Sequence, residues 1–353
     1  MQTQIKKKGD LLDLKGNLIK PGYSKKMVQR YNRENIKSGK LRIKEWDYYL
    51  IYNKKFAVAL TVADNGYMGM LSTSLINFKE ATETTKSKIT LMPKGKLNTI
   101  KATGEKTYMP NTSFEGDIYV KTKAQEYSFV VDKDRRILKN VYKNFKDKQD
   151  LEVYFELFDT PEESMCIATP FEKKPAFYYN QKIVGMRAKG YVKLGETTIK
   201  FDEKDTEAIL DWGRGVWTYK NTWYWGAGCG KVKDKEFGFN IGYGFGDTSK
   251  ASENMLFYEG KAHKLEDVTF NIPQTVTGKD DFLKPWTFTS SDGRFEMKFE
   301  PILNRKSFIN LGVLCSNQNQ VFGKFTGTAI LDDGTEIKIK DFVGFAEKVF
   351  NKW

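Results

Sequence analysis

The chain has 353 residues, of which 40% are hydrophobic and 14% aromatic, and it carries a formal net charge of +13. A single hydrophobic core stops growing at about 250 to 300 residues, so this length predicts two domains, and the apolar content excludes an intrinsically disordered chain. Only nine of the 58 basic residues are arginine, and the lysines are spread among Asp and Glu, which argues against a nucleic-acid site.

Neither membrane insertion nor export is predicted. No stretch approaches the run of about 20 apolar residues that a membrane helix requires, and the lysines at 6–8 are followed by Asp10 and Asp13 instead of an apolar signal core. The three cysteines are Cys166, Cys229 and Cys315. Because they are far apart, odd in number and without a CxxC pair, they predict neither a disulfide framework nor a zinc site. A soluble protein of the reducing cytoplasm is expected.

Most of the chain from residue 44 onward alternates apolar and polar residues, which is typical of half-buried strands. The clearest predicted strands are 45–52, 56–63, 118–123, 127–132, 151–158, 294–300 and 336–340. Turn sequences separate them at 64–66, 291–293 and 332–334, where Asp, Asn and Gly tolerate the positive φ angles of tight hairpins. Neighbouring strands are therefore expected to pair antiparallel.

Two segments depart from this pattern. Residues 134–145 combine a helical spacing of apolar residues with dense charge, and they predict one short surface helix. Residues 79–111 are poor in large apolar residues and predict long loops or edge strands of the first half. A change in composition near residues 175–205 indicates a domain boundary, and we place the two domains at 1–190 and 191–353.

The two predicted halves share a weak internal similarity. Residues 46–49 and the following strand 56–71 are echoed by residues 223–226 and the strand 237–246. Each pair consists of an aromatic strand and an apolar strand that leads into glycine, which is typical of a duplicated unit. The expected fold class is all-β, with two consecutive antiparallel β-barrels and few short helices.

The most unusual segment is 211–225, which holds Asp211, Arg214 and six large aromatic residues. The aromatic residues are Trp212, Trp217, Tyr219, Trp223, Tyr224 and Trp225. One interpretation is a core plug in which Arg214 stacks on a tryptophan and pairs with Asp211. The other is a ligand-facing cluster that lines a cavity.

Glycine occupies alternate positions in two neighbouring predicted strands, 223–230 and 237–246. A three-residue hairpin loop at 233–235 would set Gly226 opposite Gly242 and form a smooth trough flanked by aromatic side chains. A two-residue loop would set glycine opposite the apolar residues, where it serves packing or curvature. The sequence does not decide between these, and neither glycine run has the strand-to-helix context of a nucleotide-binding motif.

Two further polar features follow the glycine strands. The loop 247–254 contains Glu253, and it either lines the mouth of a barrel or is an ordinary hairpin loop. His263 is the only histidine, which excludes a multi-histidine metal site. Its role is either proton transfer or a simple hydrogen bond.

Five strings carry a resemblance to a known family. They are KEWDYY at 44–49, DWGRGVW at 211–217, NIGYGFG at 240–246, EN at 253–254 and GKAHKL at 260–265. They resemble an uncharacterised bacterial family catalogued as domain of unknown function 2804, and the resemblance extends from Leu11 to Trp353.

The middle of the chain carries a second, more distant resemblance, at Tyr178-Tyr179, Gly190-Tyr191-Val192, 210–213 and 223–225. These residues are similar to the hydroxyneurosporene synthase-like proteins, which are tandem lipocalin-like (calycin) barrels. Some of those proteins hydrate, cyclise or isomerise apolar substrates without a redox cofactor. The resemblance implies two calycin-like barrels here, with the aromatic segment opening the second, and no cofactor. The spacing from Asp211 to the next Trp-Gly differs from that of the relatives.

The favoured hypothesis is a protein that binds a lipophilic small molecule, or processes it without redox chemistry, in the second barrel. The candidate catalytic residues are Asp211, Arg214, Glu253 and His263, and the candidate ligand-binding residues are Trp212, Trp217, Trp223, Trp225, Tyr243 and Phe245. The aromatic residues would form apolar walls, and the polar residues would supply a contact or a proton. The alternatives are a carbohydrate-binding or glycan-processing protein and a scaffold without a ligand site.

Overall fold

The computed structural model describes residues 2–94, 118–132, 135–310 and 312–352, and these residues fold almost entirely into β-strands. The helices in this part of the chain are two short 3₁₀ turns, Arg33–Asn35 and Lys40–Arg42. Neither turn is long and apolar enough to cross a membrane. The predicted all-β class, with few short helices, is confirmed.

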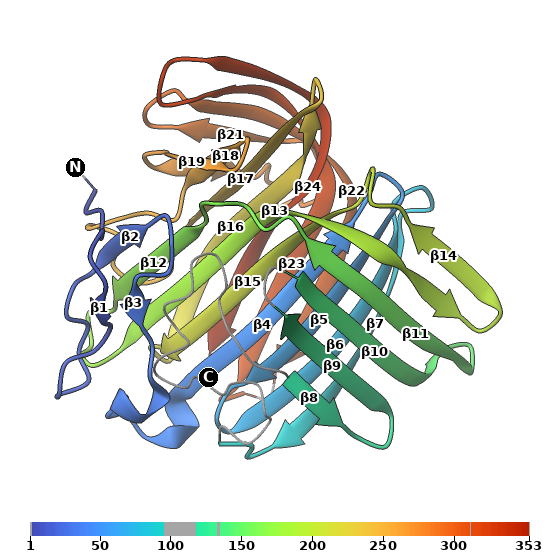
Figure 1. The fold of residues 1–353 in the computed structure, drawn as a ribbon, viewed down its shortest axis with the longest axis horizontal. Coiled ribbons are helices and arrows are strands. Elements are labelled where there is room, and N and C mark those ends of the chain that lie inside the picture. Colours follow the sequence, from blue (N-terminus) through green and yellow to red (C-terminus); the bar gives the residue numbers. More distant parts are fainter. Residues whose placement is uncertain (1, 95–117, 133–134, 311, 353) are drawn as a thin grey trace.

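The first sheet is built by the part of the chain that precedes residue 217 (Figure 1). In the described residues it contains β2 (Gly22–Ser24), β4 (Ile43–Tyr52), β5 (Phe56–Asp64), β6 (Met68–Asn77), β7 (Thr82–Leu91), β8 (Ile118–Lys121), β9 (Gln125–Asp132), β10 (Arg135–Lys146), β11 (Gln149–Phe158), β12 (Met165–Pro170), β13 (Phe177–Leu194), β14 (Thr197–Phe201) and β15 (Glu207–Val216). Its main strand order is β7-β6-β5-β4-β15-β13-β11-β10-β9-β8. Two short strands, β1 (Gly9–Asp10) and β3 (Gln29–Arg30), form a separate parallel pair.

The second sheet follows the same plan. Its strands are β16 (Lys220–Val232), β17 (Lys235–Tyr243), β18 (Met255–Tyr258), β19 (Lys261–Lys264), β20 (Val268–Asn271), β21 (Trp286–Ser290), β22 (Phe295–Asn310), β23 (Cys315–Ile330) and β24 (Glu336–Lys352), in the order β19-β18-β17-β16-β24-β23-β22-β21-β20. In each sheet four consecutive strands form a meander, and the first of them pairs with the last strand of that sheet, β4 with β15 and β16 with β24. This repetition agrees with the internal similarity in the sequence.

The chain passes from the first sheet to the second between Val216 and Lys220. The predicted boundary between residues 190 and 191 falls inside β13, whose second half still pairs with β11 and β14. The change in composition near this point therefore marks the central strands of the first sheet and not its end.

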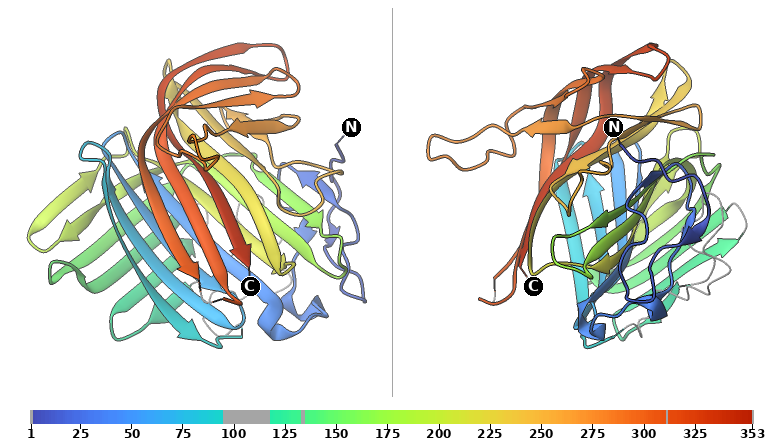
Figure 2. Two further views of the ribbon diagram at one scale, coloured as in Figure 1. Left: turned by 180° about the vertical axis from the view of Figure 1, so that it is seen from behind. Right: turned by 90° about the vertical axis from the view of Figure 1, so that its left-hand side faces the viewer.

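The second sheet packs against the outer face of the first, and Figure 2 shows it in yellow to red beside the blue strands. Three buried cores result: one inside each curled sheet, and one between the sheets that we call the seam. The seam contains Tyr48 and Ile209 from the first sheet and Trp225 and Phe345 from the second. In the described residues neither strand order returns to its first strand, so each sheet is a curled half-barrel.

The predicted helix at 134–145 is wrong, because this segment forms strand β10. The strand hydrogen-bonds to β9 on one side and to β11 on the other, and its buried residues alternate with exposed ones. After Tyr142 the pairing with β11 shifts, so that Leu138, Tyr142 and Phe145 are all buried. Their spacing imitates one face of a helix, which explains the error.

The predicted edge strand in residues 79–111 is confirmed in part, since β7 pairs with β6 at one end of the first sheet. Residues 95–111 of that segment lie outside the described residues. The predicted strands 294–300 and 336–340 are also confirmed, and each continues well beyond its predicted end as β22 and β24.

The hairpin between β16 and β17 has a two-residue loop, because Val232 pairs with Lys235. The loop residues Lys233 and Asp234 have φ angles of 49° and 64°, as a tight turn of this kind requires. Gly228 consequently stands opposite Phe239, and a Cβ added to it would lie 3.0 Å from that ring. Gly228 therefore makes room for an aromatic side chain in the core of the second sheet, and the trough interpretation is wrong.

This packing predicts the effect of filling one glycine position. Gly228→Val would overpack the second core against Phe239, and we expect the free energy of unfolding to fall by about 1 to 3 kcal/mol. Gly39→Val is the matched control, because no heavy atom lies within 4 Å of a Cβ added there. Urea unfolding of both variants measures the difference, and equal stabilities would contradict the packing role.

Candidate functional site

A buried ion pair lies at the seam between two adjacent strands of the first sheet. Lys182 on β13 stands opposite Asp211 on β15, and its Nζ lies 2.8 Å from Asp211 Oδ1. Asn180 Nδ2 donates to the same carboxylate at 2.6 Å, and Trp46 Nε1 donates to it at 3.0 Å. Lys182 and Asp211 are only 3% and 7% exposed, so each charge depends on these partners for stability.

The second sheet meets this ion pair through an aromatic ring. Lys182 Nζ lies 3.8 Å from the ring centroid of Trp225, close enough for a cation–π contact. Trp225 Nε1 donates to Asn240 Oδ1 at 2.8 Å, and Asn240 Nδ2 donates to the backbone carbonyl of Glu253 at 2.9 Å and to its Oε2 at 3.3 Å. Burial raises the pKa of the Glu253 carboxyl, while the charge of Lys182 opposes this rise. Lys182 thus links polar groups of both sheets.

A third carboxyl faces the seam from β24. Glu347 is 9% exposed, and it accepts hydrogen bonds from Trp223 Nε1 at 3.1 Å and from Gln320 Nε2 at 3.0 Å. Burial raises the pKa of Glu347 to about 7, although the hydrogen bond from Trp223 and the charge of Lys182 lower it. We call Lys182, Asp211, Glu253 and Glu347 the seam cluster. A carboxyl with this pKa can both donate and accept a proton near neutral pH.

Aromatic rings pack at one side of the seam cluster. The Phe245 ring lies 4.8 Å from Tyr178, 4.8 Å from Trp217 and 5.2 Å from Trp223, measured between centroids. Trp217 also lies 5.0 Å from Trp46, the residue that donates to Asp211. The structure therefore brings together the predicted ligand-binding residues Trp217, Trp223, Trp225 and Phe245, and the seam places the predicted acids Asp211 and Glu253 next to them.

Arg214 and Trp212 lie on the opposite face of β15, inside the first half-barrel. Arg214 is fully buried, its Nη2 is 2.7 Å from Asp47 Oδ1, and its guanidinium lies 4.1 Å from the Trp212 ring centroid. The predicted stacking is confirmed, but the predicted pairing of Arg214 with Asp211 is wrong. Residues three apart on a strand point to opposite faces, so the two side chains lie in different cores.

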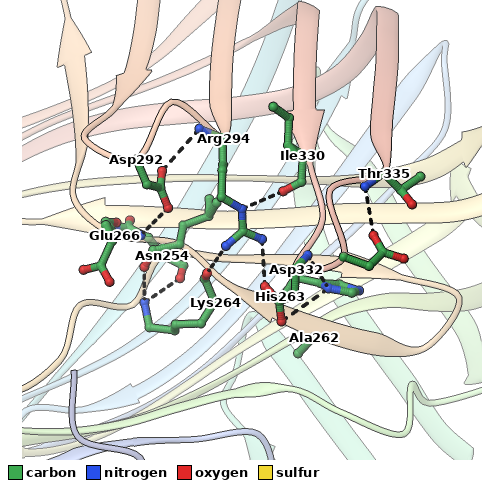
Figure 3. A network of polar contacts seen from close by, with 12 residues as sticks. Asn254, Ala262, His263, Lys264, Glu266, Asp292, Arg294, Ile330, Asp332 and Thr335 are labelled. Atoms are coloured by element: carbon green, nitrogen blue, oxygen red, sulfur yellow. Dashed lines mark hydrogen bonds and ion pairs between the residues drawn. The ribbon is translucent and has the colours of Figure 1, made fainter. Parts of the chain in front are cut away.

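His263 and Tyr243 lie away from the seam cluster. Figure 3 shows His263 on β19, where its Nδ1 accepts from the backbone N–H of Asp332 at 3.2 Å, and where Arg294 Nη2 lies 2.7 Å from Asp332 Oδ1. Burial lowers the pKa of His263, so the ring is a neutral hydrogen-bond acceptor within a surface network. Tyr243 stacks on Tyr224, with ring centroids 4.4 Å apart, at the core of the second sheet.

The described residues also bear on metal binding. No three of their His, Cys, Asp and Glu side chains are grouped so that they could hold a metal ion. The acids of the seam cluster are instead engaged by ammonium, amide and indole donors.

The family of the chain follows from its whole sequence. A family model described as domain of unknown function (DUF2804) matches residues 2–353. The chain belongs to this family. The membership expected from the five strings is thereby confirmed, and no curated protein matches the sequence.

Three solved structures are similar to this DUF2804 protein. A protein assigned as AttH from Nitrosomonas europaea is 12% identical, with 87% of this chain and 92% of that chain covered and a TM-score of 0.49. Kievitone hydratase from Nectria haematococca is 9% identical, with 88% of each chain covered and a TM-score of 0.47. CghA, solved with Sch210972, is 9% identical, with 98% of this chain and 97% of that chain covered and a TM-score of 0.41.

Sequence reasoning missed several members of the site in the DUF2804 protein, chiefly Lys182, Glu347, Asn240 and Trp46. Lys182 carries a usable signal, because it is the only charged residue in the first ten residues of β13. Glu347 carries a weaker one, because it follows an uncharged stretch of β24 but stands next to Lys348. On a strand with both faces buried, such a charge must be paired inside the protein. Burial of both faces depends on how the sheets pack, so it cannot be inferred from these residues alone.

A surface pocket of about 400 Å³ adjoins the seam. Trp217 lines the pocket, and the same ring contacts Trp46, Trp223 and Phe245 in the seam. One aromatic side chain thus separates a solvent-accessible space from the residues around Asp211.

The buried pair inside the first half-barrel predicts a large loss of stability when its carboxylate is neutralised. Asp47→Asn leaves the Arg214 charge buried without an ion-pair partner in the described residues, and we expect a loss of about 3 to 5 kcal/mol in the free energy of unfolding. Asp159→Asn, which breaks a surface pair with Arg187, should cost less than about 1 kcal/mol. Chemical denaturation of both variants tests this, and comparable small losses would show that the buried charges are solvated.

The raised pKa of Glu347 predicts a specific pH dependence of stability. Its folded-state pKa of about 7 exceeds the ordinary value of 4.5, so folding favours the protonated form, and this contribution is lost as the pH rises through 7. Glu347→Gln cannot ionise, and between about pH 5 and pH 8 it should gain up to about 3 kcal/mol in unfolding free energy relative to the wild type. Glu336→Gln, an exposed change on the same strand, should show no such gain. If the free energy of unfolding changed with pH in the same way in the wild type and in Glu347→Gln, the raised pKa of Glu347 would be contradicted.

Proposed function

We propose that this protein binds a lipophilic small molecule at the seam between its two sheets and transfers protons to or from it without redox chemistry. Hydration, isomerisation and cyclisation are reactions of this class. The proposal rests mainly on Glu347, a carboxyl at the seam that titrates near neutral pH among aromatic rings.

The seam cluster has the parts that proton transfer requires. Glu347 is the candidate acid and base, because its pKa lies near the pH at which it would work. Lys182 supplies a fixed positive charge that favours the ionised forms of both Glu347 and Glu253. Asp211 holds Lys182 in place through an ion pair of 2.8 Å and is itself held by Asn180 and Trp46.

The surroundings of the cluster favour an apolar ligand. Trp217, Trp223, Trp225 and Phe245 present large aromatic surfaces around the polar groups, and such walls with few polar contacts are typical of small-molecule sites. An aromatic environment also keeps water away from a carboxyl and so maintains its raised pKa. The pocket beside Trp217 lies against a ring that also packs in the seam.

Deuterium incorporation tests this proposal without knowledge of the substrate. The full chain is incubated in D₂O with a lipid-soluble cell extract, the products are returned to H₂O, and mass spectrometry identifies compounds that keep deuterium on carbon. Wild-type protein should produce at least one such compound, because a proton taken from solvent ends in a C–H bond. Glu347→Gln should lose this activity by about 100-fold or more, which is the usual effect of removing a general acid or base.

Glu336→Gln is the matched control and should label the same compound as the wild type. Equal labelling by Glu347→Gln would refute the role of this carboxyl. Retention of oligosaccharides on a glycan array, with no apolar compound labelled, would instead favour the carbohydrate alternative.

A further inference from the structure

The pocket beside the seam has a basic wall. Arg42, Lys44 and Lys173 line it together with Tyr67, Trp217 and Tyr219, and none of the described residues that line it is acidic. We call these six residues the basic pocket. Three cations around about 400 Å³ repel one another unless a negative charge lies between them.

Lys44 is the unusual member of the basic pocket, because its side chain is buried. It is 4% exposed at the start of β4, its Nζ donates to the Asn65 carbonyl at 2.7 Å, and it lies 4.1 Å from the Tyr67 ring centroid. Burial and the charge of Arg42 lower the pKa of Lys44 to about 7, while Asp64 opposes this shift. An anion in the pocket would favour the ammonium form, so ligand binding and protonation would support each other.

Two other groups provide donors for an anion. The buried Tyr67 hydroxyl has no hydrogen-bond partner among the described residues, and burial raises its pKa to about 12, so it remains a donor. Arg42 donates through Nη2 to the Trp217 carbonyl at 2.9 Å, which fixes the guanidinium at the pocket wall. The Lys44 ammonium already has an acceptor in the Asn65 carbonyl. The Tyr67 hydroxyl has no acceptor among the described residues, and a buried donor of this kind calls for a partner such as a bound anion.

We propose that the basic pocket binds a small organic anion, a carboxylate or phosphate attached to an aromatic or apolar body. The charged group is held by Arg42, Lys44 and the Tyr67 hydroxyl, with Lys173 at the rim. The apolar body lies against Trp217 and Tyr219. This site is separate from the seam cluster, and it binds its ligand whether or not Glu347 transfers protons.

A pair of fluorescent probes separates recognition of the anion from recognition of the rings. 8-Anilino-1-naphthalenesulfonate carries an anionic group, and N-phenyl-1-naphthylamine has the same rings without it. The full chain should bind the sulfonate about tenfold more tightly, because a charge-assisted contact in a buried site contributes more than 1.4 kcal/mol. The affinity for the sulfonate should fall in each of the variants Lys44→Met, Arg42→Gln and Tyr67→Phe. The affinity for the neutral probe should stay unchanged in all three.

The same titration has controls and a pH signature. Lys200→Met removes an exposed lysine of β14 and should leave both affinities unchanged. Sulfonate affinity should fall as the pH is raised from about 6 to about 9, since Lys44 then loses its charge, and Lys44→Met should abolish this fall. The other charged or titratable groups that line the pocket are Arg42, Lys173 and Tyr67, and the charge of Asp64 also acts on Lys44.

Competition at constant ionic strength identifies the anionic group. Displacement of the sulfonate by 1-naphthoate assigns a carboxylate ligand, and displacement by inorganic phosphate assigns a phosphate ligand. Equal binding of the two probes, unchanged sulfonate affinity in both Lys44→Met and Arg42→Gln, or displacement by neither competitor would each overturn the proposal. Glu347→Gln should bind the sulfonate like the wild type, so the two proposals can fail separately.

Discussion

The central strands of the first sheet are buried on both faces because the second sheet packs against their outer side. Strands β4 and β15 and the first half of β13 therefore alternate between two interiors, whereas most antiparallel strands alternate between an interior and water. A polar side chain on such a strand cannot reach solvent from either face, so it must find a partner inside the protein. The two buried ion pairs, Arg214 with Asp47 and Lys182 with Asp211, follow from this constraint.

One face of β4 shows how the constraint organises the site. Lys44, Trp46 and Tyr48 are two residues apart and so point to the same side of the sheet, into the seam. Lys44 lines the basic pocket, Trp46 donates to Asp211, and Tyr48 donates to Gln320, which in turn donates to Glu347. A single strand thus connects the pocket, the ion pair and the titrating carboxyl.

Alternation of apolar and polar residues was sufficient to predict strands, hairpins and two similar halves, because these depend on neighbours in sequence. It failed at β10, where a shift in pairing gave Leu138, Tyr142 and Phe145 the spacing of a helix. It also grouped Asp211 with Arg214, although a strand separates them onto opposite faces. The partners Lys182 and Glu347 were missed since they approach Asp211 only through strand pairing and sheet packing, which the local sequence does not encode.

The two buried ion pairs differ in what surrounds them, and this difference decides which of them can serve chemistry. Arg214 and Asp47 lie within the interior of one sheet, against the Trp212 ring, so exposing them requires the sheet itself to open. Lys182 and Asp211 lie where two sheets meet, and the Trp225 ring of the second sheet contacts Lys182. Two sheets that pack only through side chains can separate locally while the backbone hydrogen bonds within each sheet remain. This costs less free energy than breaking the hydrogen bonds of a sheet. Under the proposed function, a ligand would therefore reach the seam cluster at a lower cost than the interior of the half-barrel.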